Sequence, residues 1–175
     1  MNASAAALRA HMRGPGRMRF SAVIAAVAAA ALVLAFVQFG SKAHSATPHR
    51  ATTDFAKKYT AAVTDLANQT RSLQIKAQGV SAPTTDSLLA VYRQLDVLAT
   101  DALTQIKKLT PDPQSAQAFN SFVASLGKYE QDLRSVIYAG DANDANGLRN
   151  ALQAFQADTT ALASARADLE ATLIR

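Results

Sequence analysis

The chain has 175 residues, no cysteine and a formal net charge of +5, from 18 basic and 13 acidic residues. Because cysteine is missing, disulfides, thiolate catalysis and a lipidated-cysteine anchor are excluded. The charge is uneven: residues 1–19 hold four arginines and no acid, whereas residues 40–175 hold fourteen basic and thirteen acidic residues. The longer part is therefore nearly neutral, which argues against nucleic acid as a partner.

An uncharged, apolar segment follows the basic arm and runs from Phe20 to Phe39. Ten of its residues are valine, isoleucine, leucine or phenylalanine, and its two polar residues lie near its ends. A helix of this length rises about 30 Å, which matches the hydrocarbon core of a bilayer. The segment is predicted to be a transmembrane helix, with the lipid bilayer as its partner.

The flanking charges predict the orientation of this helix. Basic residues concentrate on the cytoplasmic side of membrane helices, and four precede the apolar segment: Arg9, Arg13, Arg17 and Arg19. Residues 1–19 are therefore expected to be a cytoplasmic arm, and the rest of the chain to lie outside the cytoplasm. The length of the segment favours an uncleaved signal-anchor. Cleavage stays an alternative, because Ser41-Lys42-Ala43 and Ala43-His44-Ser45 have small residues at the required spacing.

Small residues recur at every fourth position inside the apolar segment. This spacing lets two transmembrane helices approach closely, so self-association within the membrane is one interpretation. The other is the general abundance of alanine in this chain. The positions concerned form two series, Ser21, Ala25 and Ala29, and Ala22, Ala26 and Ala30.

Residues 40–53 are mostly small and polar and include Pro48, which is typical of a linker. The rest of the chain has apolar residues at alternating spacings of three and four, which is typical of amphipathic helices. Four such series are present: Phe55, Tyr59, Val63, Leu66, Thr70, Leu73, Ala77; Leu88, Tyr92, Leu95, Leu98, Ala102, Ile106, Leu109; Phe119, Phe122, Leu126, Tyr129, Leu133, Ile137; and Leu148, Leu152, Phe155, Thr159, Leu162, Leu169, Leu173.

Short connections between the four helices favour an all-α fold, an antiparallel up-down four-helix bundle over residues 54–175. Asp112-Pro113 is predicted to cap and begin the third helix, and Gly140 to end it. The tyrosines of the apolar series are expected to fill the core with their hydroxyls at its rim. Contact of these hydroxyls with a ligand is the alternative. Arg166 is expected to extend outward from the edge of the fourth series.

The residues needed for catalysis or metal binding are poorly placed. The three histidines, His11, His44 and His49, precede the predicted bundle, and Glu130 and Glu170 have no histidine at metal-ligand spacing. Serines and threonines lack an activating base nearby in the sequence. The aspartate pairs Asp54 with Asp65 and Asp96 with Asp101 are interpreted as solvated charges, because their spacings of eleven and five do not set two carboxylates together on one helical face. No catalytic, cofactor-binding or metal-binding residue is therefore predicted.

The stretch "YRQLDVLATDALTQIKKLTPDPQSAQAFNSFVASLGKYEQDLRSVIYAGD" combines a helix ending in L-x-P, spaced aromatics and an A-G-D sequence before the last helix. In these features it resembles small exported or membrane-anchored helical-bundle proteins of high-GC bacteria. The resemblance covers the bundle and carries no catalytic motif. It implies a fold and a location, and supplies no site residue.

These observations favour a non-enzymatic, single-pass protein of the cell membrane whose extracytoplasmic bundle binds another envelope protein. A ligand-binding or sensory bundle is one alternative, and a secreted helical protein after signal cleavage is another. Sensory bundles of chemoreceptors return through a second membrane span, and none is found after the bundle in this sequence.

Overall fold

The computed structural model describes residues 53–78 and 85–174, and these residues are all-helical with no strand. The all-α prediction is thus confirmed for this part of the chain. The predicted cytoplasmic arm, the apolar segment Phe20–Phe39 and the linker up to residue 52 lie outside the described residues. Within them, no helix is long and apolar enough to cross a membrane. The four helices are α3 (Asp54–Gln78), α4 (Thr85–Ile106), α5 (Ala116–Asp141) and α6 (Ala145–Ile174).

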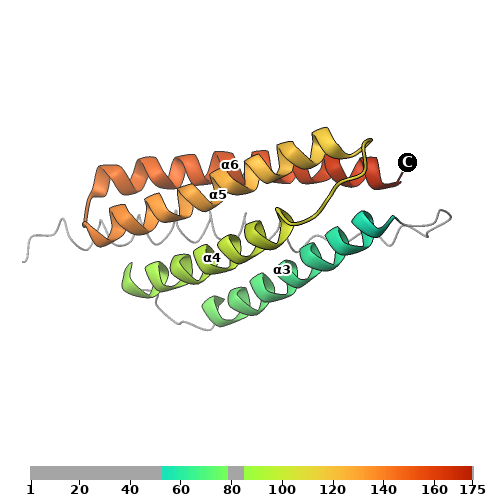
Figure 1. The fold of residues 1–175 in the computed structure, drawn as a ribbon. Coiled ribbons are helices and arrows are strands. Elements are labelled where there is room, and N and C mark those ends of the chain that lie inside the picture. The colour runs from blue at the N-terminus through green and yellow to red at the C-terminus, as the bar shows by residue number, and fades with distance from the viewer. Residues whose placement is uncertain (1–52, 79–84, 175) are drawn as a thin grey trace, which may run out of the picture.

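Successive helices run in opposite directions and form an up-down bundle (Figure 1). Each helix packs against the next one along the chain: α3 on α4, α4 on α5, and α5 on α6. The C-terminus lies at the same end of the bundle as the start of α3 (Figure 1). Four-helix bundle topology therefore agrees with the short connections seen in the sequence.

Helices α5 and α6 are joined by a turn whose residues satisfy the backbone groups of both helix ends. Asn143 adopts the left-handed conformation with φ 53°. The amides of Asn143 and Asp144 donate to the carbonyls of Gly140 and Ala139, which is the Schellman pattern. The Asp144 carboxylate then accepts hydrogen bonds from the amides at 146 and 147 and caps α6. Gly140 consequently lies inside α5, and the prediction that it ends the helix was wrong.

Gly140 has a packing role instead. It is buried on α5, and a Cβ atom at this position would collide with the side chain of Leu89 on α4. The missing side chain therefore allows α4 and α5 to approach closely at this point. Arg93 of α4 forms an ion pair with Asp141 of α5 one residue further on.

The start of α5 also differs from the sequence prediction. The helix begins at Ala116, so Asp112 and Pro113 precede it. They belong to a turn in which the Asp112 carbonyl accepts a hydrogen bond from the Ser115 amide. Ser115 is fully buried, and its hydroxyl is hydrogen-bonded to that of Thr172 on α6 at 3.0 Å. This contact with α6 gives Ser115 a partner that no local sequence rule anticipates.

The core contains most of the apolar series predicted from the sequence. Two helices are rotated slightly relative to the prediction. On α4 the fully packed positions are Ala99 and Leu103, whereas Leu98 is only partly buried. On α5 Val136 is buried at 1 % exposure, and Ile137 lies at the margin. The rotation brings Leu98 toward solvent beside α3, where it contributes to a groove described below.

Aromatic rings connect α3 with α5, α4 with α6, and α5 with α6. Phe55 and Tyr59 of α3 make edge-to-face contacts with Phe119 and Phe122 of α5, with ring centroids 5.3 and 5.6 Å apart. Phe155 of α6 lies 5.8 Å from the ring of Tyr92 and 5.1 Å from that of Tyr129. The prediction that these tyrosines fill the core is confirmed.

The hydroxyl of Tyr59 does not lie at the rim of the core, where the sequence predicted it. The residue is 1 % exposed, and its Oη atom is buried without a hydrogen-bond partner among the described residues. Nearby, Arg166 donates from Nε to Glu170 at 2.7 Å, and the Arg166 side chain is only 11 % exposed. The prediction that Arg166 extends outward was therefore wrong, because its ion pair holds it against the bundle.

Replacing Tyr59 with phenylalanine is expected to stabilise the bundle by about 1 kcal/mol, because it removes a buried, unsatisfied hydroxyl and keeps the ring. Thermal unfolding followed by circular dichroism measures the effect. Tyr138→Phe is the matched control, since Tyr138 is 78 % exposed and its hydroxyl reaches solvent. A lower melting temperature for Tyr59→Phe than for the control would show that the hydroxyl has a partner.

Candidate functional site

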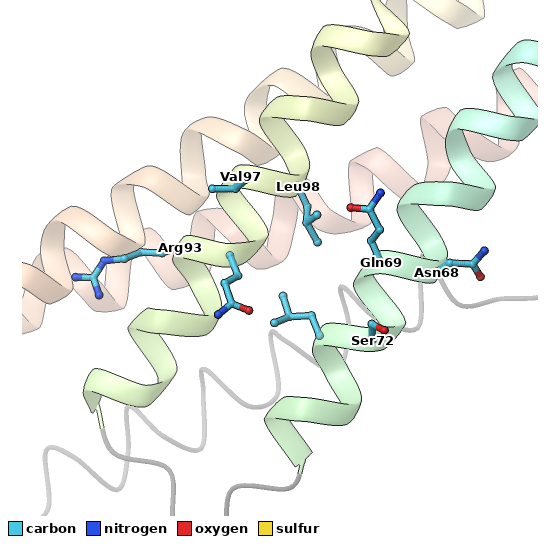
Figure 2. Close-up of a pocket in the computed structure, with 8 residues that line it drawn as sticks. Asn68, Gln69, Ser72, Arg93, Val97 and Leu98 are labelled. Atoms are coloured by element: carbon cyan, nitrogen blue, oxygen red, sulfur yellow. The ribbon is translucent and has the colours of Figure 1, made fainter.

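A groove of about 630 Å³ lies between α3 and α4. In Figure 2, Gln69 of α3 and Leu98 of α4 extend into the space between these two helices, whereas Arg93 extends away from α3. The groove surface is mostly apolar, with amide and hydroxyl groups around it. Its lining residues are Asn68, Gln69, Ser72, Leu73, Arg93, Gln94, Val97 and Leu98.

Two exposed aliphatic side chains belong to this part of the surface. Val97 lines the groove and is 58 % exposed. Ile75, one turn beyond Ser72 on α3, is 64 % exposed. Residues three and four apart share a helical face, so Ile75 continues the face that contributes Asn68 and Ser72 to the groove. Isolated exposed aliphatic side chains are common on protein surfaces. These two differ because they lie at or beside a partly apolar groove.

The groove is almost free of charge. Of its eight lining residues, all of them described, only Arg93 is charged, and Arg93 is paired with Asp141. Asn68, Gln69, Ser72 and Gln94 offer neutral donors and acceptors. Such a surface suits a neutral, partly apolar partner, and it contains no general base or nucleophile–base pair that would support a reaction.

A polar network joins α4 to α5 on another face. Arg134 donates to Asp96 at 3.2 Å and to Glu130 at 2.7 Å, and the Thr100 hydroxyl donates to Glu130 at 2.7 Å. The Asp96 and Glu130 side chains are 23 % and 15 % exposed. The sequence had suggested that Asp96 is a fully solvated charge. The structure shows instead that its side chain is partly buried. The network links two helices and pairs both of its carboxylates with the single guanidinium of Arg134.

The other aspartates considered from the sequence do not form a site. Asp54 forms an ion pair with Lys58 at 2.7 Å, and Asp65 accepts a hydrogen bond from Gln69. Asp101 is exposed on α4. These carboxylates lie on solvated helix faces, in agreement with the sequence interpretation.

Sequence reasoning missed a different pair of carboxylates, Asp132 on α5 and Asp158 on α6. Burial raises the pKa of the Asp132 carboxyl to about 6, helped by its hydrogen bond and charge repulsion with Asp158 and opposed by Lys128. The Oδ2 atom of Asp132 is buried. A second groove of about 600 Å³ between α5 and α6 includes Asp132 in its lining.

Burial also raises the pKa of all three core tyrosines, Tyr59, Tyr92 and Tyr129, above their ordinary value. Their phenols are therefore protonated at neutral pH, so none is a ready proton acceptor. Among residues 53–78 and 85–174, no group of three or more His, Asp or Glu side chains is arranged to hold a metal ion.

The sequence-predicted membrane residues lie outside the described part of the chain. These are the four arginines of the arm and the two small-residue series of the apolar segment. The three histidines also lie outside the described residues. The chain matches no protein-family model, no curated protein and no solved structure in the comparisons made. The function must therefore be inferred from the residues and the geometry alone.

Proposed function

We propose that this chain is a non-enzymatic, single-pass protein of the bacterial cell membrane that binds another envelope protein through the groove between α3 and α4. The apolar segment Phe20–Phe39 would hold it in the bilayer, and the arginines before it would keep the N-terminus in the cytoplasm. The bundle would then lie outside the cytoplasm. The observation that carries the binding proposal is the nearly uncharged groove, which is lined by exposed Val97 and continued along α3 by exposed Ile75.

The chemistry of the groove indicates the kind of partner. Its apolar floor would take aliphatic or aromatic side chains, and its amide and hydroxyl rim would pair with neutral polar groups. A strongly charged partner would gain nothing, because Arg93 is already neutralised by Asp141. An amphipathic helix whose apolar anchors are flanked by uncharged polar residues fits this surface best.

The location is tested with a C-terminally tagged full chain. We expect it to stay in the membrane fraction after carbonate washing and to lose the tag when external protease is added to spheroplasts. Its intact mass should include residues 1–43. A mature chain that begins near residue 44 or 46 would show a cleaved signal, and a protected tag would place the bundle in the cytoplasm.

Binding through the groove is tested by photocrosslinking in living cells from position 97, with position 138 as the exposed control on α5. We expect an adduct with one envelope protein from position 97, none from position 138, and its loss in the Ile75→Asp variant. An adduct of twice the chain mass would identify a second copy as the partner instead. No adduct from position 97 would contradict the proposal.

A further inference from the structure

The Asp132 side chain of α5 lies within hydrogen-bond reach of the Asp158 side chain of α6, at the seam between two helices that pack against each other. Asp132 is partly buried on α5, next to the core residue Leu133, and Asp158 is partly buried on α6, next to the core residue Thr159. Neither carboxylate can move far away, because its neighbour in the sequence is fixed in the core. Their closeness is therefore a property of the packed bundle.

The two groups cannot form a hydrogen bond while both are ionised. A carboxylate only accepts, and the Oδ2 atom of Asp132 has no donor among the described residues although it is buried. One proton held between the two groups would turn one of them into a donor. It would also replace the repulsion of two negative charges with a single shared charge.

The surrounding charged residues do not remove the repulsion between the two carboxylates. Lys128, one turn earlier on α5, lowers the pKa of the Asp132 carboxyl. This effect is smaller than the combined effect of burial and Asp158, which raise that pKa. Arg134, which lines the adjacent groove, is engaged with Asp96 and Glu130. Asp144, also in this groove, caps α6 and adds no positive charge.

We propose that Asp132 and Asp158 share one proton across the seam between α5 and α6 and so make the stability of the bundle depend on pH. The groove beside them gives the proton a path to solvent. Below pH 6 the shared proton joins the two helices. Above pH 6 it is released, and two ionised carboxylates then repel each other across the seam.

The direction of the pH effect follows from linkage. The folded-state pKa of Asp132, about 6, lies above the value of about 4 for an unfolded aspartate, so the folded state binds more protons between these values. The contribution of this pair to stability is fully present below pH 4 and is lost as the pH rises through 6. An ordinary salt-bridged aspartate has the opposite dependence.

The test compares thermal unfolding of the full chain in detergent between pH 4 and pH 8, for wild type, Asp132→Asn and Asp158→Asn. An asparagine amide donates permanently, as the shared proton does. Both variants should raise the melting temperature at pH 7.5 by about 3 °C, and both should remove the wild-type decline between about pH 4 and 6. Asp168→Asn, an exposed change on α6, should keep the wild-type profile.

Carboxyl carbon shifts measured by NMR give a second readout that does not depend on the stability of any variant. The Asp132 carboxyl should titrate near pH 6 in the wild type and at a lower pH in Asp158→Asn, which removes the neighbouring negative charge. A wild-type Asp132 titration near pH 4, or stability profiles of Asp132→Asn and Asp168→Asn that coincide, would overturn the proposal.

Discussion

Replacing Leu95 with aspartate is expected to unfold the bundle at ordinary temperatures. Leu95 lies on α4 and is 2 % exposed, so the new carboxylate would be buried without a partner. The loss of apolar packing and the cost of burying a charge together destabilise by about 4 kcal/mol or more, a large part of the stability of a domain of this size. The helical signal at 222 nm, followed on heating, measures the loss.

Val97→Asp is the matched control for Leu95→Asp. It introduces the same charge on the same helix, two residues away, at a side chain that is 58 % exposed. Its effect on stability should stay within about 0.5 kcal/mol. Equal melting temperatures for the two variants would mean that α4 presents a different face to the core.

Phe155→Ala is expected to cost about 3–5 kcal/mol, because it leaves a cavity where rings of three helices meet. Phe155 of α6 is fully buried and contacts Tyr92 of α4 and Tyr129 of α5. The expected result is a large fall in the urea concentration at the midpoint of unfolding.

Phe155→Leu serves as the volume control for this cavity. Leucine keeps most of the buried apolar surface but loses the edge-to-face ring contact with Tyr92, so a loss of about 1–2 kcal/mol is expected. If Phe155→Ala were as mild as Phe155→Leu, the surrounding side chains would have to close the cavity, which would contradict the expected cost of about 3–5 kcal/mol.

The number and type of helices could be predicted from the sequence because each helix has one continuous apolar face. The rotation of α4 about its own axis could not be predicted from the sequence. Leu95, Leu98, Ala99, Ala102 and Leu103 are all apolar, so two overlapping series satisfy the helical period equally well. The choice between them depends on α3 and α5, which bury Ala99 and Leu103 and leave Leu98 at the groove.

The candidate sites were still less predictable, because they depend on pairs of helices. Asp132 and Asp158 lie on different helices, and spacing rules within one helix do not detect them. A usable signal was present: each aspartate directly precedes a core position, Leu133 or Thr159, and therefore lies near a helix–helix seam. Arg166 is a different case, because its partner Glu170 lies four residues later on the same helix and was visible at that spacing.

The ring contacts of α3 have a consequence for the order in which the bundle assembles. The contacts of α4 with α5 and of α5 with α6 join neighbours along the chain, and such local topology closes quickly with little loss of loop entropy. Phe55 and Tyr59, in contrast, meet rings that lie more than 60 residues later along the chain. As the first helix of the bundle, α3 should therefore be the last to dock, closing over a three-helix intermediate that already holds Phe119 and Phe122 in place.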